Sequence, residues 1–474
     1  MNTPAEEKCF FCSKIIYAIL EYSKIIIFSV FSLWLLWNIV MYYPGTPTLD
    51  TYGQLLQGTS GELTNWKPAI YSFLLGVLEK EWEGSALKIA YLFQLVGMGL
   101  GCVGIAYAYS CKSRIYALLI FVLPIFFTEK CIGINTVGND AAAATCYLIY
   151  IAGILLACEK KIKKWLIFIS LFFLLFGLHL RHNSIFAVIV LLAWGVYKVR
   201  MDGVRKCILV SIALSCVMLV VNATIINCLD VKKTYPLKFG LAADLVNLSI
   251  IDGQWSEICN KRAVKEFPLP HKFSPLRACV PNVGTPINPY ETLSDPEAEK
   301  LSYEELKREW LKEVCKSPHR YLLLKCLFFE QFLFCGIHVP VVCDVVKGMY
   351  PHVNVHMTEE SSNWRSWINR KRLSCSMIPM ILYFFLIVTF TRCCMVKDGY
   401  AWLRNRSSEC KDLLFFLAAS FTYTFTFFPV VFSATEFRFY IIRGALCSLV
   451  AVMMCLIIVR KILKNISPAF KDYQ

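Results

Sequence analysis

Charged residues are scarce in this sequence. Only 18% of its 474 residues are Asp, Glu, Lys or Arg, whereas 57% are hydrophobic and 14% are aromatic. A soluble chain of this length would form two or three domains with a far more charged surface. The same apolar content excludes a disordered chain and a simple DNA-binding module. The composition therefore predicts a polytopic membrane protein.

The chain also lacks the short motifs that mark several kinds of active site. It contains no P-loop, no GxSxG elbow, no HExxH motif and no Gly-rich dinucleotide fingerprint, which leaves an ATP-powered transporter without support. Its 22 cysteines show no metal-site spacing, so no cofactor is predicted, and a divalent cation stays open but unsupported. Cys259 and Cys279 either form one disulfide in an oxidising compartment or remain two free thiols.

Long apolar runs are abundant. The first follows Lys8, Lys14 and Lys24 and continues to about Val40, which predicts a signal-anchor helix with a cytoplasmic N-terminus. Further spans are expected near residues 87–109, 115–127, 141–157, 165–178, 185–197, 208–226, 377–391, 413–431 and 439–459. The predicted fold is an all-α polytopic membrane protein with roughly 10–11 transmembrane helices.

The basic residues assign the loops to two sides of the membrane. The net charge is +15, and Lys and Arg gather in short loops such as 160–164 and 198–206, which are predicted to be cytoplasmic. The loops that carry Asp50, Arg181 and Glu436 then lie on the extracytoplasmic side. Because this charge pattern orients helices, no nucleic-acid partner is expected.

Three regions are predicted along the chain. They are an N-terminal transmembrane module over residues 1–228, an extracytoplasmic loop region with short helices over 229–320, and a C-terminal transmembrane module over 321–474. A helix that starts at Ser294 either lies on the membrane surface or covers an outer site as a lid. The apolar segment 321–337 is interpreted as interfacial or re-entrant, because a further span there would invert everything after it.

The loop after the first span holds the most informative polar residues. Proline and glycine at positions 44–47 stop the helix and place Asp50 a few residues beyond the bilayer. A carboxylate there is partly desolvated and can act as a base or a cation ligand, and the alternative is an N-cap for a helix over 51–57. Gln54 and Lys67 follow in the same loop as candidate substrate-binding residues.

Arg181, His182 and Asn183 form a second polar group at the outer end of a later span. A lone arginine at a membrane edge is most often a snorkelling anchor. Because Asp50 and Lys67 are expected on the same side, the group is better explained as a wall that binds an anion. Phosphate is the natural ligand, since guanidinium and ammonium groups pair with it strongly.

Four more charged residues are expected near this face. Asp140 begins a span, where it either faces a polar cavity, as buried acids in membranes usually do, or caps the helix. Glu436 and Arg438 lie in a short outer turn and form a local salt bridge or supply an acid and a base to the cavity with Asp50. Lys130 lies in a neighbouring outer loop and joins this set.

The order of these features resembles the GT-C superfamily of polytopic glycosyltransferases, most closely bacterial members related to protein mannosyltransferases and aminoarabinose transferases. The matching features are Tyr-Pro-Gly…Asp…Gln at 43–54, Trp-Lys-Pro at 66–68, Arg-His-Asn at 181–183, Trp…Pro-His-Arg-Tyr-Leu at 310–322 and Glu-Phe-Arg-Phe-Tyr at 436–440. The likeness covers most of the chain as an order of features. It departs in the first loop, where many relatives carry two acids and Glu62 is the only second one here.

The resemblance implies an enzyme that moves a sugar from a polyprenyl-phosphate-type donor to an extracytoplasmic acceptor, which is a cell-envelope glycan, lipid or protein. The expected location is a bacterial inner (plasma) membrane. By position, Asp50 corresponds to the family's acid at the acceptor, and Lys67, Arg181 and Arg438 correspond to its phosphate-binding cations. The alternatives are a transporter or flippase for a lipid-linked or anionic solute, and an O-antigen ligase or polymerase.

Overall fold

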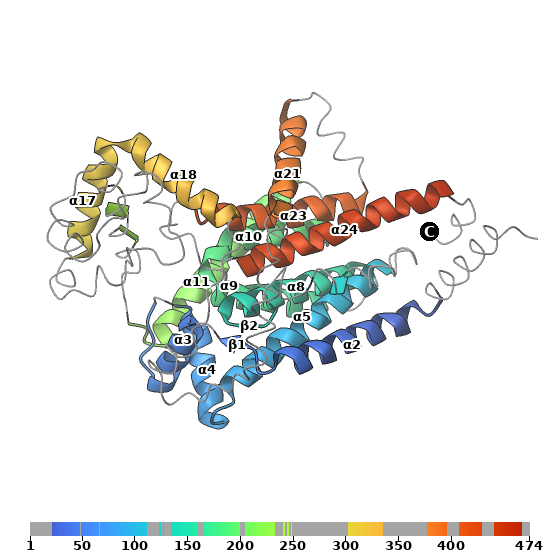
Figure 1. Ribbon diagram of the computed structural model, residues 1–474, viewed down its shortest axis with the longest axis horizontal. Coiled ribbons are helices and arrows are strands. Elements are labelled where there is room, and N and C mark those ends of the chain that lie inside the picture. Colours follow the sequence, from blue (N-terminus) through green and yellow to red (C-terminus); the bar gives the residue numbers. More distant parts are fainter. Residues whose placement is uncertain are drawn as a thin grey trace, which may run out of the picture.

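A computed structural model of the chain describes residues 21–47, 49–65, 67–110, 123–124, 127, 134–159, 165–199, 204–232, 240–241, 244–245, 248, 302–334, 377–395, 407–428 and 440–466. These residues form a helical bundle with one very small sheet (Figure 1). The helices are α2 (Ser23–Tyr42), α3 (Leu49–Ser60), α4 (Ala69–Glu81), α5 (Ala86–Ser110), α8 (Asn139–Glu159), α9 (Trp165–Leu180), α10 (Ile185–Lys198), α11 (Val204–Cys228), α17 (Tyr303–Lys316), α18 (Pro318–Phe334), α21 (Met377–Met395), α23 (Ser408–Phe425) and α24 (Tyr440–Ile466), with a 3-10 turn η2 (His182–Ser184) and strands β1 (Thr46–Pro47) and β2 (Thr136–Val137).

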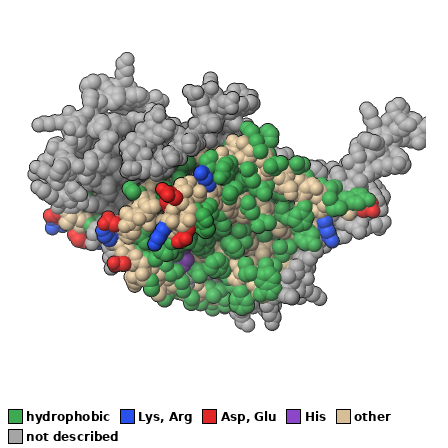
Figure 2. Space-filling model, turned by 90° about the horizontal axis from the view of Figure 1, so that it is seen from below, with side chains coloured by type: hydrophobic (Ala, Val, Ile, Leu, Met, Phe, Trp, Pro, Cys, Tyr) green, Lys and Arg blue, Asp and Glu red, His purple; other side chains and the backbone are tan. Residues whose placement is uncertain are grey.

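Several of these helices suit a membrane. Among the described residues, four segments are long and apolar enough to cross one, namely Lys24–Tyr42, Ala86–Ser110, Asn139–Cys158 and Ile441–Ile458, while α9 and the segment of α10 are apolar but shorter. The described surface in Figure 2 is mainly apolar, with charged side chains mostly toward its ends. Lipid solvates such a surface, and helices satisfy their own backbone hydrogen bonds there. The chain is therefore an all-α membrane protein, as its composition predicts.

Small residues bring the central helices α5 and α8 together. Gly97, Gly101 and Gly104 lie on one face of α5, because they are spaced by four and three residues. A Cβ atom added at these positions would lie 2.5 Å from Thr145 Cγ2, 2.9 Å from Leu148 Cβ and 2.8 Å from Ala152 Cβ, all in α8. Close approach of this kind drives helix association in membranes, where lipid offers little hydrophobic driving force.

The bundle has two ends, which we call the Asp50 end and the Asp412 end (left and right in Figure 1). The Asp50 end holds the last residues of α2, the short helices α3 and α4, and the first residues of α5. The Asp412 end holds the first residues of α2 and of α23 and the last residues of α24. The chain therefore crosses the bundle repeatedly between these two ends.

The small sheet joins two loops at the Asp50 end. β1 and β2 pair in parallel, with Thr46 opposite Thr136 and Pro47 opposite Val137. Gly45 precedes β1 with a φ of +86°, and a side chain there would meet Val137 at 2.5 Å, so this approach requires glycine. The segment after α2 thus lies directly beside the segment that leads into α8.

Most predicted spans match described helices to within a few residues, but the helix expected at 439–459 continues to Ile466 as α24. The prediction for 413–431 is wrong at both ends, because α23 begins at Ser408, where the Ser407 side chain accepts a hydrogen bond from the backbone N–H of Cys410, and ends at Phe425. The span expected at 115–127 lies almost entirely outside the described residues. The apolar segment near 321–337 belongs to α18 up to Phe334.

The helix expected to start at Ser294 corresponds to α17, and its predicted start is wrong. α17 begins at Tyr303, because Ser302 caps it in a reciprocal arrangement with Glu305, in which each side chain binds the other residue's backbone N–H. Ser294 itself lies outside the described part of the chain. The sequence pattern Ser-x-x-Glu at 302–305 is the signal for this start.

Candidate functional site

Asp50 and Lys67 form an ion pair at the Asp50 end. Lys67 Nζ lies 2.8 Å from Asp50 Oδ1 and donates to the Asp50 backbone oxygen at 3.1 Å. The alternative that Asp50 caps a helix over 51–57 is wrong, because α3 begins at Leu49 and Asp50 lies in its first turn. An acid in the first turn is stabilised by the helix dipole. The side chains of Asp50 and Lys67 are 24% and 14% exposed, so the pair is accessible from outside.

Asp140 and Arg181 form a second, more deeply buried ion pair. Arg181 Nε lies 3.0 Å from Asp140 Oδ1, and their side chains are 11% and 2% exposed, respectively. The guanidinium also lies 5.8 Å from the ring centroid of Phe427 and close to the hydroxyl of Tyr423. Arg181 is thus held inside the bundle by an acid, and the alternative of a snorkelling anchor is wrong.

Three side chains fix the backbone between the two ion pairs. Thr51 Oγ1 and Gln94 Nε2 donate to the backbone oxygens of residues 137 and 138, at 2.7 and 2.9 Å. Asn139 Nδ2 donates to the backbone oxygen of Leu180 at 3.0 Å. The helix that carries Asp50 is therefore linked through residues 137–139 to the segments that carry Asp140 and Arg181.

The charges are arranged differently from the predicted anion-binding wall. Lys67 and Arg181 each lie against an acid, so the site is built from two ion pairs and not from a row of cations. A lysine beside Asp50 favours its ionised form, which can accept a proton. Both cations remain able to share their charge with an anionic ligand. The described residues contain no group of three or more His, Cys, Asp or Glu side chains that could hold a metal ion.

Glu62, the second acid of the first loop, does not belong to this site. It pairs with Lys232 at 3.1 Å, and the two side chains are 69% and 62% exposed. Such an exposed pair contributes little to stability. The acid of the second ion pair is Asp140, which enters from a segment about 90 residues after Asp50 and is brought there by the fold.

The remaining predicted site residues have different surroundings. Gln54 is buried on α3, His182 is partly buried and Asn183 is exposed, the latter two in η2. Outside the described residues lie Lys130, Glu436 and Arg438, together with Cys259 and Cys279. Of the ten predicted site residues, the structure thus brings Asp50, Lys67, Asp140 and Arg181 into two ion pairs.

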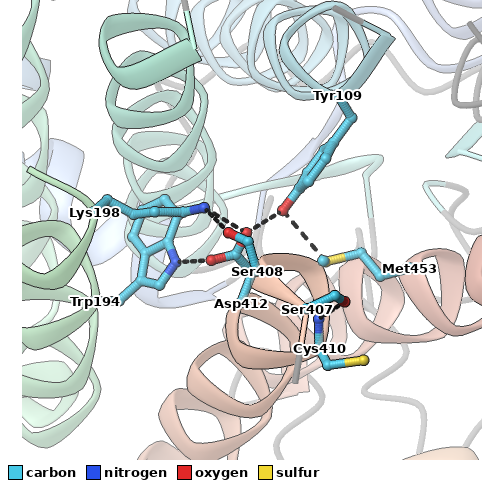
Figure 3. Close-up of polar contacts among 8 residues, drawn as sticks. All are labelled: Tyr109, Trp194, Lys198, Ser407, Ser408, Cys410, Asp412 and Met453. Carbon is cyan, nitrogen blue, oxygen red and sulfur yellow. Dashed lines mark hydrogen bonds and ion pairs between the residues drawn. The ribbon is translucent and has the colours of Figure 1, made fainter. Parts of the chain in front are cut away.

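A buried polar cluster at the opposite end escaped the sequence analysis (Figure 3). Asp412 is fully buried and accepts hydrogen bonds from Tyr109 at 2.9 Å and from Trp194 at 2.8 Å. Lys198 Nζ lies 2.8 Å from Asp412 Oδ2 and donates to Ser408 at 2.9 Å. We call these five residues the Asp412 cluster. The cluster joins α5, α10 and α23. The sequence signal that could have predicted it is an acid, Asp412, near the start of an apolar helix.

A third buried ion pair ties the loop region to α17 and α18. Lys325 Nζ lies 2.7 Å from Asp244 Oδ1, and Trp310 Nε1 donates to Asp244 Oδ2 at 3.2 Å. Burial raises the pKa of the Asp244 carboxyl, and Lys325 opposes this rise. Trp310 and Tyr321 pack edge to face with ring centroids 5.5 Å apart. These contacts hold α17 against the first turns of α18.

No protein-family model, curated protein or solved structure matches this chain. The features that indicate a function are therefore the two ion pairs and their position at one end of the bundle.

Proposed function

We propose that this protein is a GT-C-type membrane glycosyltransferase with roughly 10–11 transmembrane helices, in a bacterial inner membrane. It moves a sugar from a polyprenyl-phosphate-type donor to an extracytoplasmic acceptor, which is a cell-envelope glycan, lipid or protein. The observation that supports it best is that the Asp50–Lys67 and Asp140–Arg181 ion pairs lie at the same end of an apolar bundle and are linked through residues 137–139. A partly exposed acid beside a lysine, with an arginine at the same end of the bundle, suits chemistry on a phosphorylated lipid.

The basic loops support the orientation in this proposal. Lys198, which opens the basic stretch 198–206, lies at the Asp412 end, and α8 ends at the same end with Glu159, directly before the basic residues 160–164 of the sequence. By the positive-inside rule this end faces the cytoplasm. The Asp50 end then faces outward, where lipid-linked sugars meet their acceptors.

In the proposed reaction, Asp50 takes the proton from an acceptor hydroxyl as the hydroxyl oxygen attacks the anomeric carbon of the sugar. The bond between this carbon and the phosphate oxygen breaks, and its electron pair leaves with the phosphate. Attack opposite the leaving group inverts the configuration at the carbon. Lys67 and Arg181 stabilise the negative charge on the departing phosphate.

The transporter alternative fits the described charges less well. A transporter needs polar groups near the middle of the membrane. In α5, α8, α10, α23 and α24, the described charged residues lie within about one turn of a helix end, apart from those beyond residue 458 in α24. The Asp412 cluster also joins three helices through buried contacts at the end that a transporter would have to open.

The first test replaces the proposed base. We expect Asp50→Asn to lower glycosyl transfer by roughly 10²- to 10⁴-fold, because the amide keeps the shape of the carboxylate but cannot accept the proton. Transfer is measured on purified protein in lipid, with radiolabelled polyprenyl-phosphate sugars as donors.

Glu62→Gln is the matched control, since it neutralises an acid of the same loop that pairs with Lys232 at the surface. This variant should transfer sugar like the unmodified protein. Full activity of Asp50→Asn would rule out Asp50 as the base.

A further inference from the structure

Several buried side-chain oxygens toward the Asp50 end lack a hydrogen-bond partner in the described part of the chain. Gln54 Oε1, Ser72 Oγ and Gln94 Oε1 belong to the most deeply buried residues among them, while Thr46 Oγ1 and Gln57 Oε1 belong to less buried ones. Gln54, Ser72 and Gln94 are 1%, 0% and 3% exposed. Leaving a buried polar group unpaired costs free energy, so natural proteins keep such groups where another molecule satisfies them.

Helices α3 and α4, which carry Gln54 and Ser72, run side by side in the same direction. The Asp50–Lys67 ion pair joins their beginnings. Farther along, Gly58 and Gly76 are in backbone contact, and a Cβ atom added at Gly76 would lie 2.2 Å from the Gly58 oxygen. The paired positions are offset by 67 − 50 = 17 and 76 − 58 = 18 residues.

Gln54 lies one turn before Gly58 on α3, and Ser72 lies one turn before Gly76 on α4, so both are on the faces where the helices meet. The Ser72 backbone oxygen would lie 2.0 Å from a Cβ atom added at Gly58. Gln94 reaches the same region from α5, because its Nε2 donates to the hydroxyl of Tyr71 at 3.3 Å and to the backbone oxygen of Gly138 at 2.9 Å. We call Gln54, Ser72 and Gln94 the acceptor cluster. It lies beside the peptide segment that leads into Asp140.

The chemistry of the acceptor cluster selects its ligand. Two amide oxygens and one hydroxyl offer lone pairs, and they do so at the end of the bundle that also carries the Lys67 and Arg181 cations. The cations disfavour a metal ion or an ammonium group, and the lone pairs disfavour an anion. A neutral molecule with several O–H donors satisfies the cluster, and a sugar is such a molecule.

We propose that the acceptor cluster is a hydroxyl-binding subsite for the sugar of the lipid-linked donor. This proposal rests on the proposed function, since that function supplies the sugar. The two ion pairs then bind the phosphate and activate the acceptor, while Gln54, Ser72 and Gln94 distinguish one sugar from another. Rejection of the wrong sugar follows because a missing hydroxyl leaves buried acceptors unpaired.

Binding of bare and glycosylated lipids tests the subsite. Full-length protein in lipid nanodiscs is titrated with bare polyprenyl phosphate and with polyprenyl phosphates that carry a hexose, a pentose or an amino sugar. The unmodified protein should bind its best glycosylated lipid more tightly than the bare lipid. Gln54→Leu and Ser72→Ala should weaken binding of that glycosylated lipid on the order of tenfold and leave the bare lipid unchanged.

The thermal stability of the Gln54→Leu variant distinguishes a ligand-binding role of Gln54 from a structural one. Because Gln54 Oε1 is unpaired without ligand, Gln54→Leu should leave the thermal unfolding midpoint of the ligand-free protein unchanged or raise it. Thr59→Ala is the control on the same helix, where the exposed Thr59 Oγ1 donates to the Leu56 backbone oxygen at 3.0 Å, and it should not change lipid binding.

The outcomes distinguish this inference from the proposed function. The subsite is overturned if Gln54→Leu weakens binding of the bare and the glycosylated lipid equally, leaves both affinities unchanged, or lowers the unfolding midpoint. Binding of the lipid by the unmodified protein would still stand. If the unmodified protein binds neither lipid, the proposed function fails and the subsite fails with it.

Discussion

Asp412 carries its charge where solvent does not reach it. Its carboxylate is fully buried and is surrounded by Tyr109, Trp194 and Lys198, each of which contacts one of its oxygens at 2.8–2.9 Å. A buried charge is tolerated only when it is paired and hydrogen-bonded. At the scale of single residues, the stability of this end of the bundle therefore depends on complete pairing.

Removing one partner of this pair should destabilise the protein strongly. We expect Lys198→Met to lower the free energy of unfolding by about 3–5 kcal/mol, because Asp412 is left as an uncompensated buried charge. The double variant Lys198→Met/Asp412→Leu removes both charges and should recover much of that loss. The free energy of unfolding of both variants is measured by thermal and denaturant unfolding in detergent. An equal loss of stability in the single and the double variant would contradict this account.

The contact between α3 and α4 shows what an element pair contributes to the site. Their backbones touch at Gly58 and Gly76, and this approach sets the distance at which Asp50 meets Lys67. The sequence shows two glycines in short apolar segments, which alone indicates little. The contact explains both glycines, because a side chain at either position would push the two helices apart.

A single methyl group at this contact should disturb the site. Gly76→Ala places a Cβ atom 2.2 Å from the Gly58 oxygen, so the helices must move apart. We expect a lower unfolding midpoint and weaker glycosyl transfer. Gly99→Ala in α5 is the matched control, because its Cβ would meet only Trp34 at the ordinary distance of 3.5 Å. This control should be neutral or slightly stabilising, and equal effects of the two changes would refute the packing argument.

At the scale of the whole molecule, the two ion pairs and the Asp412 cluster lie at opposite ends of the bundle. One end combines accessible and buried ion pairs with unpaired acceptors, and the other is closed by a fully hydrogen-bonded carboxylate. This asymmetry suits an enzyme that works on one face of the membrane better than a transporter that opens to both.

Reporter fusions test this orientation. Alkaline phosphatase, which folds only outside the cytoplasm, should be active when fused after Lys232, beyond α11, and inactive when fused after Lys198, at the end of α10. The two positions lie at opposite ends of the bundle, and the positive-inside rule assigns their sides. The reverse pattern would place the Asp50 end in the cytoplasm and remove the basis of the proposed function.

Much of the fold was predictable from the chain, and much of the site was not. The span expected at 87–109 is α5 at Ala86–Ser110, since apolar length is a property of contiguous residues. Asp140 and Arg181 were both singled out, but as separate groups. Their pairing depends on how α8 packs against α9, and no local pattern contains that information.

The sequence by itself determined that this protein is an all-α membrane protein, and it indicated where most of its helices run. These properties follow from the free energy of placing each residue in lipid or water, which is set locally. Only the tertiary structure decided which charges meet, because Asp50 with Lys67, Asp140 with Arg181 and Lys198 with Asp412 are paired by helix packing. It also decided that the oxygens of Gln54, Ser72 and Gln94 are buried without a partner in the described part of the chain, since burial and pairing depend on how closely the helices approach.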